Sequence, residues 1–139
     1  VPGPRWQGES LMGKTLFVHA EQGLGDTLQF IRYVKLLRTD GSRIIARVPK
    51  TLLPLLTASG YDELIPTGQS PAQYDYHVPL MSLPRVLGHT LENIPREVPY
   101  VHARPDLVEH WRRQLAPWPG LRIGINWQGK PQYTLDRYR

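Results

Sequence analysis

Two glycines and an acidic residue follow an apolar run near the start of this chain. The run is Leu16-Phe17-Val18, and the glycine-containing stretch is Gly23-Leu24-Gly25-Asp26. Glycines after a strand allow a tight turn and let a ligand approach the backbone closely. An aspartate at such a point can cap a helix or accept a proton from a ligand, and one residue can have both roles. This stretch is therefore the first candidate site.

Two known phosphate-binding motifs do not match this stretch. The dinucleotide fingerprint needs a third glycine where the chain has Leu28, and an acidic residue near the end of the second strand, where it has Val48-Pro49-Lys50. A Walker loop needs Gly-Lys-Ser/Thr after the glycines, and none follows. Two interpretations remain: a glycine turn that directs Asp26 toward a ligand, or a turn in which Asp26 only caps the helix.

Two histidines and a serine are further candidates for binding or catalysis. His19 and His77 each lie at or near the end of a predicted strand, so they can face one cleft or serve as buried structural residues. Together with Asp26 they offer three metal ligands, but the spacing matches no known ligand pattern, and no metal is predicted. Ser82 with His77 suggests a hydrolase pair, yet no nucleophile-elbow motif surrounds Ser82.

The elements that must position these residues alternate along the chain. Strand patterns cover residues 15–20, 43–48, 63–66, 75–79 and 121–127. Helical patterns cover residues 26–38, 51–59, 82–87 and 105–115. Asp26 is the predicted N-cap of the first helix, with Gln29 completing a capping box. This rhythm predicts a Rossmann-like α/β fold, a mostly parallel sheet flanked by helices that binds ligands at the carboxyl ends of its strands.

The composition limits the class of protein. A length of 139 residues suits one domain with its own core. No apolar run approaches the ~20 residues of a membrane span, so none is predicted. The net charge of +5 comes from scattered basic residues, which argues against a nucleic-acid partner. There is no cysteine, which excludes disulfides and thiolate metal sites and favours a cytoplasmic location.

Several segments, in the same order, resemble one bacterial family. The segments are Phe17–Phe30, Tyr76–Pro84, Ile94-Pro95, Val98–Tyr100 and Ile123–Pro131. The Glu-Gln-Gly-Leu-Gly-Asp string is the most specific match, and His77 and Ser82 fall in a His-x-Pro-Leu-x-Ser-Leu-Pro segment. These segments are similar to the glycosyltransferase-like domain that follows tetratricopeptide repeats in many bacterial proteins, and more distantly to the ADP-heptose:lipopolysaccharide heptosyltransferase family.

The resemblance implies a GT-B architecture, in which two Rossmann-like domains face a cleft. The first domain of such proteins supplies acceptor contacts and the catalytic base, and Asp26 matches that base by position. The second domain binds the nucleotide-sugar, which is the donor substrate, and no other cofactor is implied. Lys130 and Arg137 are the candidates for the donor phosphates. The implied substrate-binding residues are His19, Gln22, Gly23, Leu24, Gly25, His77 and Ser82.

The same resemblance implies how the chain is organised. Residues 1–13 would be a linker from upstream tetratricopeptide repeats, residues 14–118 the Rossmann-like N-terminal domain, and residues 119–139 the start of a second domain. We therefore expect the acceptor-side half of a glycosyltransferase that acts on a nucleotide-sugar and a hydroxyl acceptor, inactive as this piece alone. The alternative is a non-catalytic binding or assembly module that accompanies the repeats.

Overall fold

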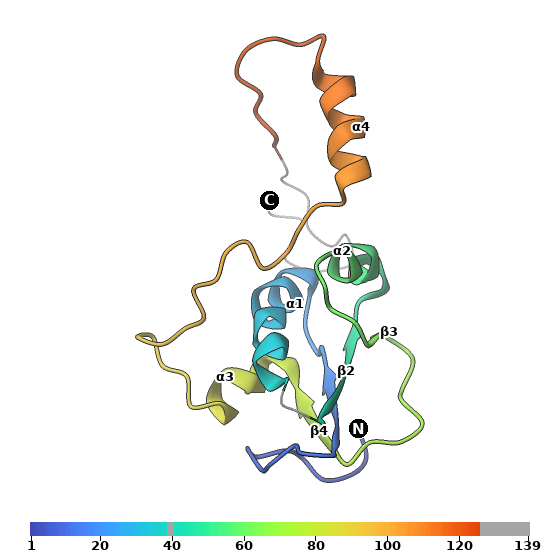
Figure 1. Cartoon of the computed structure of the whole chain (residues 1–139), viewed down its shortest axis with the longest axis vertical. Coiled ribbons are helices and arrows are strands. Elements are labelled where there is room, and N and C mark those ends of the chain that lie inside the picture. The colour runs from blue at the N-terminus through green and yellow to red at the C-terminus, as the bar shows by residue number, and fades with distance from the viewer. Residues whose placement is uncertain (39–40, 126–139) are drawn as a thin grey trace, which may run out of the picture. The chain divides into compact units, whose positions relative to one another are not determined.

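The computed structural model describes residues 1–38 and 41–125 (Figure 1). The chain forms two compact units, Val1–Pro105 and Asp106–Arg139. The boundary between them falls thirteen residues before the domain end expected at residue 118, and that expectation stays a prediction.

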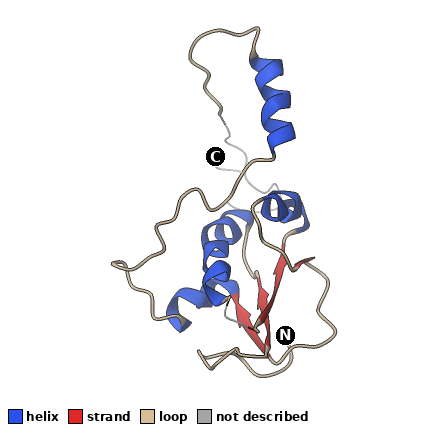
Figure 2. Ribbon diagram, viewed as in Figure 1, coloured by secondary structure: helices blue, strands red, loops and turns tan. Residues whose placement is uncertain are grey.

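The first unit contains a parallel sheet, as the alternating pattern predicts (Figure 2). In the described residues its order is β3-β2-β1-β4, and every neighbouring pair is parallel. This confirms the α/β, Rossmann-like class. The strands are β1 (Thr15–His19), β2 (Arg43–Val48), β3 (Leu64–Pro66) and β4 (Tyr76–Pro79).

The predicted fifth strand is wrong over the residues that the structure describes. Residues 121–125 have no regular secondary structure, and residues 126–127 lie outside the described part of the chain. The outer edge of β4 is already hydrogen-bonded to the N-terminal segment. The amide of Trp6 donates to the carbonyl of His77 at 2.9 Å, and the amide of His77 donates to the carbonyl of Pro4 at 3.0 Å. A further strand on that edge would have to displace this segment.

The first predicted helix is present but changes type along its length. It begins two residues earlier than expected, as α1 (Leu24–Phe30), and continues as the 3-10 segment η1 (Ile31–Leu37). The buried side chains Ile31, Val34 and Leu37 recur every three residues. A three-residue repeat matches a 3-10 helix better than an α-helix of 3.6 residues per turn, because side chains at i and i+3 align in a 3-10 helix.

The remaining helices follow the predicted order. They are η2 (Lys50–Leu52), α2 (Leu53–Ala58), η3 (Leu80–Ser82), α3 (Leu83–Val86) and α4 (Pro105–Leu115). Proline lies in the first turn of both α2 and α3, where its missing N–H costs no intrahelical bond. No helix among the described residues has the length and apolar character that crossing a bilayer requires.

The main core lies on one face of the sheet. Alternate strand residues Leu16, Val18 and Val78 pack there with apolar side chains of η1, α2 and α3. Trp6 and Leu11, from the predicted linker, are also buried in this core. Both side chains therefore pack into the first unit, and full burial of a large apolar side chain stabilises a fold by about 1.5–3 kcal/mol. The other residues of the segment 1–13 are exposed, and its assignment as a linker stays a prediction.

The second unit is described over α4 and the segment that follows it. The bounds of α4 equal the predicted 105–115, yet the helix contains no buried residue. Its apolar side chains stay exposed, and so do those of the next segment. They are Leu107, Val108, Trp111, Leu115, Trp118, Leu121, Ile123 and Ile125.

Candidate functional site

The candidate site lies where β1 and β4 end. β1 has β2 on one side and β4 on the other, so the chain adds strands in two directions from β1. In parallel sheets, the crevice at such a change of direction is the usual place for a ligand. His19, the last residue of β1, is in register with Arg47 of β2 and with Pro79 of β4. The turn that follows β1 leads directly into α1.

Asp26 is the third residue of α1 rather than its N-cap, so the predicted cap position is wrong. Gly23 is the N-cap, and it has no side chain with which to accept a hydrogen bond. The Oδ2 atom of Asp26 reaches back and accepts the Gly23 amide at 3.1 Å, as the acidic residue of a capping box does. The predicted partner Gln29 is not needed, because its position falls in the next turn.

The carboxylate of Asp26 is only partly engaged by this bond. Its side chain is half-buried, and Oδ1 has no hydrogen bond to another described residue. Asp26 also has no hydrogen bond to His19, His77 or Ser82 in the described part of the chain. The structure therefore places Asp26 at the end of β1 with one oxygen held and the other available to a ligand.

Neither glycine of the turn is required by its backbone conformation or by packing. Gly23 and Gly25 are absent from the residues with positive φ. A methyl group added at Gly25 would meet nothing within 4 Å, and one at Gly23 would meet Asp26 Oδ2 at an ordinary 3.5 Å. Leu24 and Gln22 beside them are exposed. The glycines thus leave the backbone of this turn bare toward solvent, which permits close approach by a ligand.

The two predicted histidines meet on the face of the sheet opposite the main core. Nε2 of His19 lies 3.3 Å from Nδ1 of His77. Burial, followed by the nearby charge of Arg47, lowers the pKa of His19 to about 4. Burial is also the first cause that lowers the pKa of His77. Both rings are therefore neutral at pH 7, so one nitrogen of the pair donates and the other accepts.

Cationic neighbours make this pair a poor place for a metal ion. Arg47 and Arg5 both lower the pKa of His19 through their charge. The same positive potential opposes a divalent cation. Within the described residues, no group of three or more histidine, cysteine or carboxylate side chains is placed to hold a metal.

Arg47 was not predicted as a site residue, although the alternation of residues along its strand indicates where its side chain lies. It alternates with the buried residues Ala46 and Val48 along β2, and it is the direct neighbour of His19 across the strands. Its guanidinium lies 5.1 Å from the centre of the Phe17 ring, and its buried Nε has no hydrogen-bond partner among the described residues. Period-two alternation in the two strands would have placed Arg47 and His19 on one face.

Two further contacts bind the residues that follow β4, one to Glu21 after β1 and one to Arg5 of the N-terminal segment. Oε2 of Glu21 accepts the amide of Leu80 at 3.1 Å, and Nη2 of Arg5 donates to Oγ of Ser82 at 2.9 Å. The described partner of Ser82 is thus an arginine rather than His77, which gives no support to a hydrolase pair. Lys130 and Arg137 lie outside the described residues.

The well-formed pockets of the first unit lie beside this site rather than on it. One of about 420 Å³ is bordered by α1, η1 and α3, one of about 680 Å³ lies near the amino end of β1, and one of about 430 Å³ borders Trp6. None of these three has Asp26 or the glycine turn in its lining. Asp26 itself is therefore presented on an open surface in this unit.

Comparison with known proteins gives one distant similarity. The chain is 29% identical to Protein FlbA of Caulobacter vibrioides (strain ATCC 19089 / CIP 103742 / CB 15) over 149 aligned residues. The alignment covers 92% of this chain and 25% of that protein, so the chain spans about a quarter of the length of this curated relative. No family model matches the chain. No solved structure matches it either.

Proposed function

We propose that this chain is the acceptor-side half of a glycosyltransferase, and that Asp26 is its catalytic base. The full enzyme would transfer a sugar from a nucleotide-sugar to the hydroxyl group of a glycan, lipid or protein, in the cytoplasm and with no further cofactor. Two findings support the proposal together: the sequence resemblance and the Rossmann-like sheet. The observation that supports it most is the position of Asp26, half-exposed in the first turn of α1 after β1, with one oxygen that has no hydrogen bond to the described residues.

The proposed reaction has one proton transfer at Asp26. Its carboxylate takes the proton from the acceptor hydroxyl as the hydroxyl oxygen forms a bond to the anomeric carbon of the donor. The bond between that carbon and the donor phosphate oxygen breaks, and the nucleotide diphosphate leaves with the electron pair. The Gly23 amide supports this role, because it holds the carboxylate in place while leaving Oδ1 available.

The other predicted site residues would bind and orient substrate. The neutral pair of His19, the last residue of β1, and His77, the second residue of β4, offers one donor and one acceptor for hydroxyl groups. The bare backbone at Gly23 and Gly25 admits a sugar close to the turn. Developing charge on the leaving phosphate requires positive groups, for which Lys130 and Arg137 remain the candidates from the resemblance.

A second candidate is a non-catalytic binding or assembly module beside tetratricopeptide repeats. The observation that favours it is the exposed apolar surface of the second unit, where Trp118 is 70% and Leu121 is 90% exposed. Clusters of exposed apolar side chains are typical of protein interfaces. On this alternative, Asp26 is a helix cap and nothing more.

A transfer assay separates the two candidates. A longer protein that contains this chain is incubated with a panel of nucleotide-sugars, and release of nucleotide diphosphate and formation of glycoside are followed. The glycosyltransferase proposal expects both products from the longer protein and none from the 139-residue chain, because on this proposal the chain supplies one of the two domains that a GT-B architecture needs. Turnover by the isolated chain would contradict the half-enzyme proposal, and no turnover by the longer protein would favour the binding module.

A further inference from the structure

The pocket of about 420 Å³ begins one helical turn beyond Asp26. Gln29 and Phe30 line it, and they lie three and four positions after Asp26 in the chain. Side chains at these spacings share one face of an α-helix. With a rise of about 1.5 Å per residue, Gln29 lies roughly 4.5 Å along the helix axis from Asp26. A ligand in the pocket can therefore extend along α1 to the Asp26 carboxylate.

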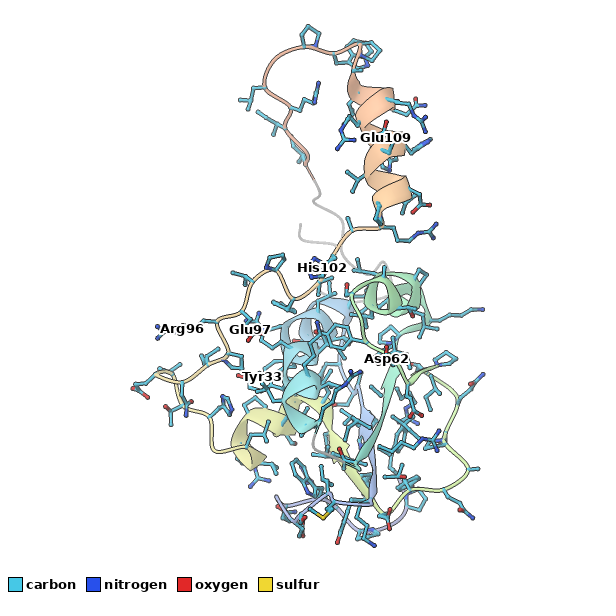
Figure 3. All side chains as sticks on the ribbon, in the orientation of Figure 1. Tyr33, Asp62, Arg96, Glu97, His102 and Glu109 are labelled. Atoms are coloured by element: carbon cyan, nitrogen blue, oxygen red, sulfur yellow. The ribbon has the colours of Figure 1, made fainter. Side chains whose placement is uncertain are left out.

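Aromatic rings form much of the pocket wall. Phe30 and Tyr33 have ring centres 6.2 Å apart and nearly parallel planes at 25°. Tyr33, which Figure 3 labels beside the α1–η1 helix, also meets the ring of His89 edge-on at 5.3 Å. Leu91 and Ile94 add exposed apolar surface to the lining. Such a wall suits the apolar face of a ring-shaped ligand.

A few polar groups in this pocket lack partners within the described part of the chain. Nδ1 of His89 is buried and has no hydrogen-bond partner among the described residues. The side-chain amide of Gln29 is exposed and has no hydrogen bond to another of the described residues. A buried polar atom without a partner costs free energy that a bound donor or acceptor recovers. The pocket thus favours a ligand that has hydroxyl groups as well as an apolar face.

The charge of the pocket points to a neutral ligand. No carboxylate lines it, and its cation, Arg32, is already engaged. The guanidinium of Arg32 donates to the Pro95 carbonyl at 3.3 Å and to the Tyr100 hydroxyl at 2.7 Å, and it lies 4.0 Å from the centre of the Tyr100 ring. An anionic ligand would have to compete with these contacts.

We propose that this pocket binds a neutral pyranose ring of the acceptor, with the ring against Phe30 and its hydroxyls bonded to Gln29 and His89. The volume lies within the range of roughly 300–1,000 Å³ that small-ligand sites occupy. That the sugar is the acceptor rests on the proposed function, whereas binding of the sugar does not require transfer.

The test is a titration of the isotope-labelled 139-residue chain by NMR. The probes are methyl α-D-glucopyranoside, methyl α-D-mannopyranoside, methyl β-D-galactopyranoside and, as a flat ring without a sugar face, adenine. We expect saturable shifts with at least one pyranoside, confined to residues 29–33 and 84–94. Gln29→Ala should weaken that binding about fivefold or more, as expected for one lost hydrogen bond. Gln73→Ala is the matched control, because Gln73 is also exposed but lines another pocket.

Three outcomes would overturn the inference. They are the absence of saturable shifts with all three pyranosides, tight binding of adenine alone, and equal weakening by Gln29→Ala and Gln73→Ala. The transfer assay above stands apart from this titration. Pyranoside binding without any transfer by the longer protein would contradict the proposed enzyme and support the sugar pocket. Transfer without pyranoside binding would support the proposed enzyme and contradict the sugar pocket.

Discussion

At the scale of single residues, His19 is the side chain whose chemistry is most altered by the fold. Its ring is 9% exposed, and its nearest described partner is another histidine. The folded state therefore disfavours its charged form, whereas an unfolded chain accepts the proton at the ordinary pKa near 6.5. Between pH 6.5 and pH 4 the unfolded state binds more protons at His19 than the folded state does. The contribution of the neutral His19 to stability is therefore fully present above pH 6.5 and is lost as the pH falls toward 4.

This linkage predicts a pH dependence that His19 controls. Between pH 7 and pH 5 the contribution of His19 to the free energy of unfolding should fall by about 2 kcal/mol. Urea unfolding at several pH values measures it, and His19→Gln should make the dependence clearly shallower. His110→Gln, at an exposed histidine of the second unit, is the control and should leave the slope unchanged. Parallel slopes for the wild type and His19→Gln would show that His19 is not the titrating group.

The sequence predicted which elements carry the site residues, but it did not predict the hydrogen bonds that these residues make. The turn after β1, Asp26 and the two histidines were all located correctly on their elements. The capping geometry was missed, because the sequence does not reveal that the helix begins at Leu24 and that Asp26 bonds backward to Gly23. The pairing of Arg5 with Ser82 was also out of reach, since 77 positions separate them.

At the scale of elements, the sequence pattern predicts the strands of the sheet but does not predict which segment pairs with its outer edge. Apolar and alternating runs, separated by helical patterns, predicted four strands to within two residues at either end. The fifth failed because edge pairing depends on which segment reaches β4, and local pattern does not determine this. The segment around Arg5 has prolines at positions 2 and 4 and no strand pattern, yet it pairs with His77 and buries Trp6.

The N-terminal segment should therefore be needed for stability. Trp6 is 4% exposed, its Nε1 donates to the Glu9 carbonyl at 2.8 Å, and its backbone bonds to β4. Trp6→Ala should lower the free energy of unfolding by about 3–5 kcal/mol, as expected for a large buried aromatic side chain. Denaturant melts give the value. Trp118→Ala, at a mostly exposed tryptophan, should change it by no more than ~0.5 kcal/mol. Equal effects would contradict this role of Trp6 and would favour the predicted linker over residues 1–13.

At the scale of the whole molecule, the two units should differ in local stability. β1 lies inside the sheet with partners on both sides, whereas α4 buries no side chain. An isolated helix of this length is marginal in water without packing. Amide hydrogen exchange should therefore be strongly protected at Phe17 and Val18, and close to that of an unstructured peptide along Val108–Leu115. Protection of α4 equal to that of β1 would contradict this description of the second unit.

We propose that Asp26 is a catalytic base as well as a helix cap, and one substitution separates these roles. Asp26→Asn keeps an oxygen that accepts the Gly23 amide and removes the basic carboxylate, so it should cost less than ~1 kcal/mol of stability. Asp62→Asn, at an exposed carboxylate paired with Arg38, is the matched control, because surface ion pairs contribute little.

The deciding measurement is the turnover of these two variants in the longer protein, beside their melting temperatures. We expect Asp26→Asn to stay folded and to lose transfer by on the order of a hundredfold or more, the usual loss when a general base is removed. Asp62→Asn should retain wild-type transfer. A folded Asp26→Asn protein with full transfer activity would contradict the account and leave Asp26 as a cap alone.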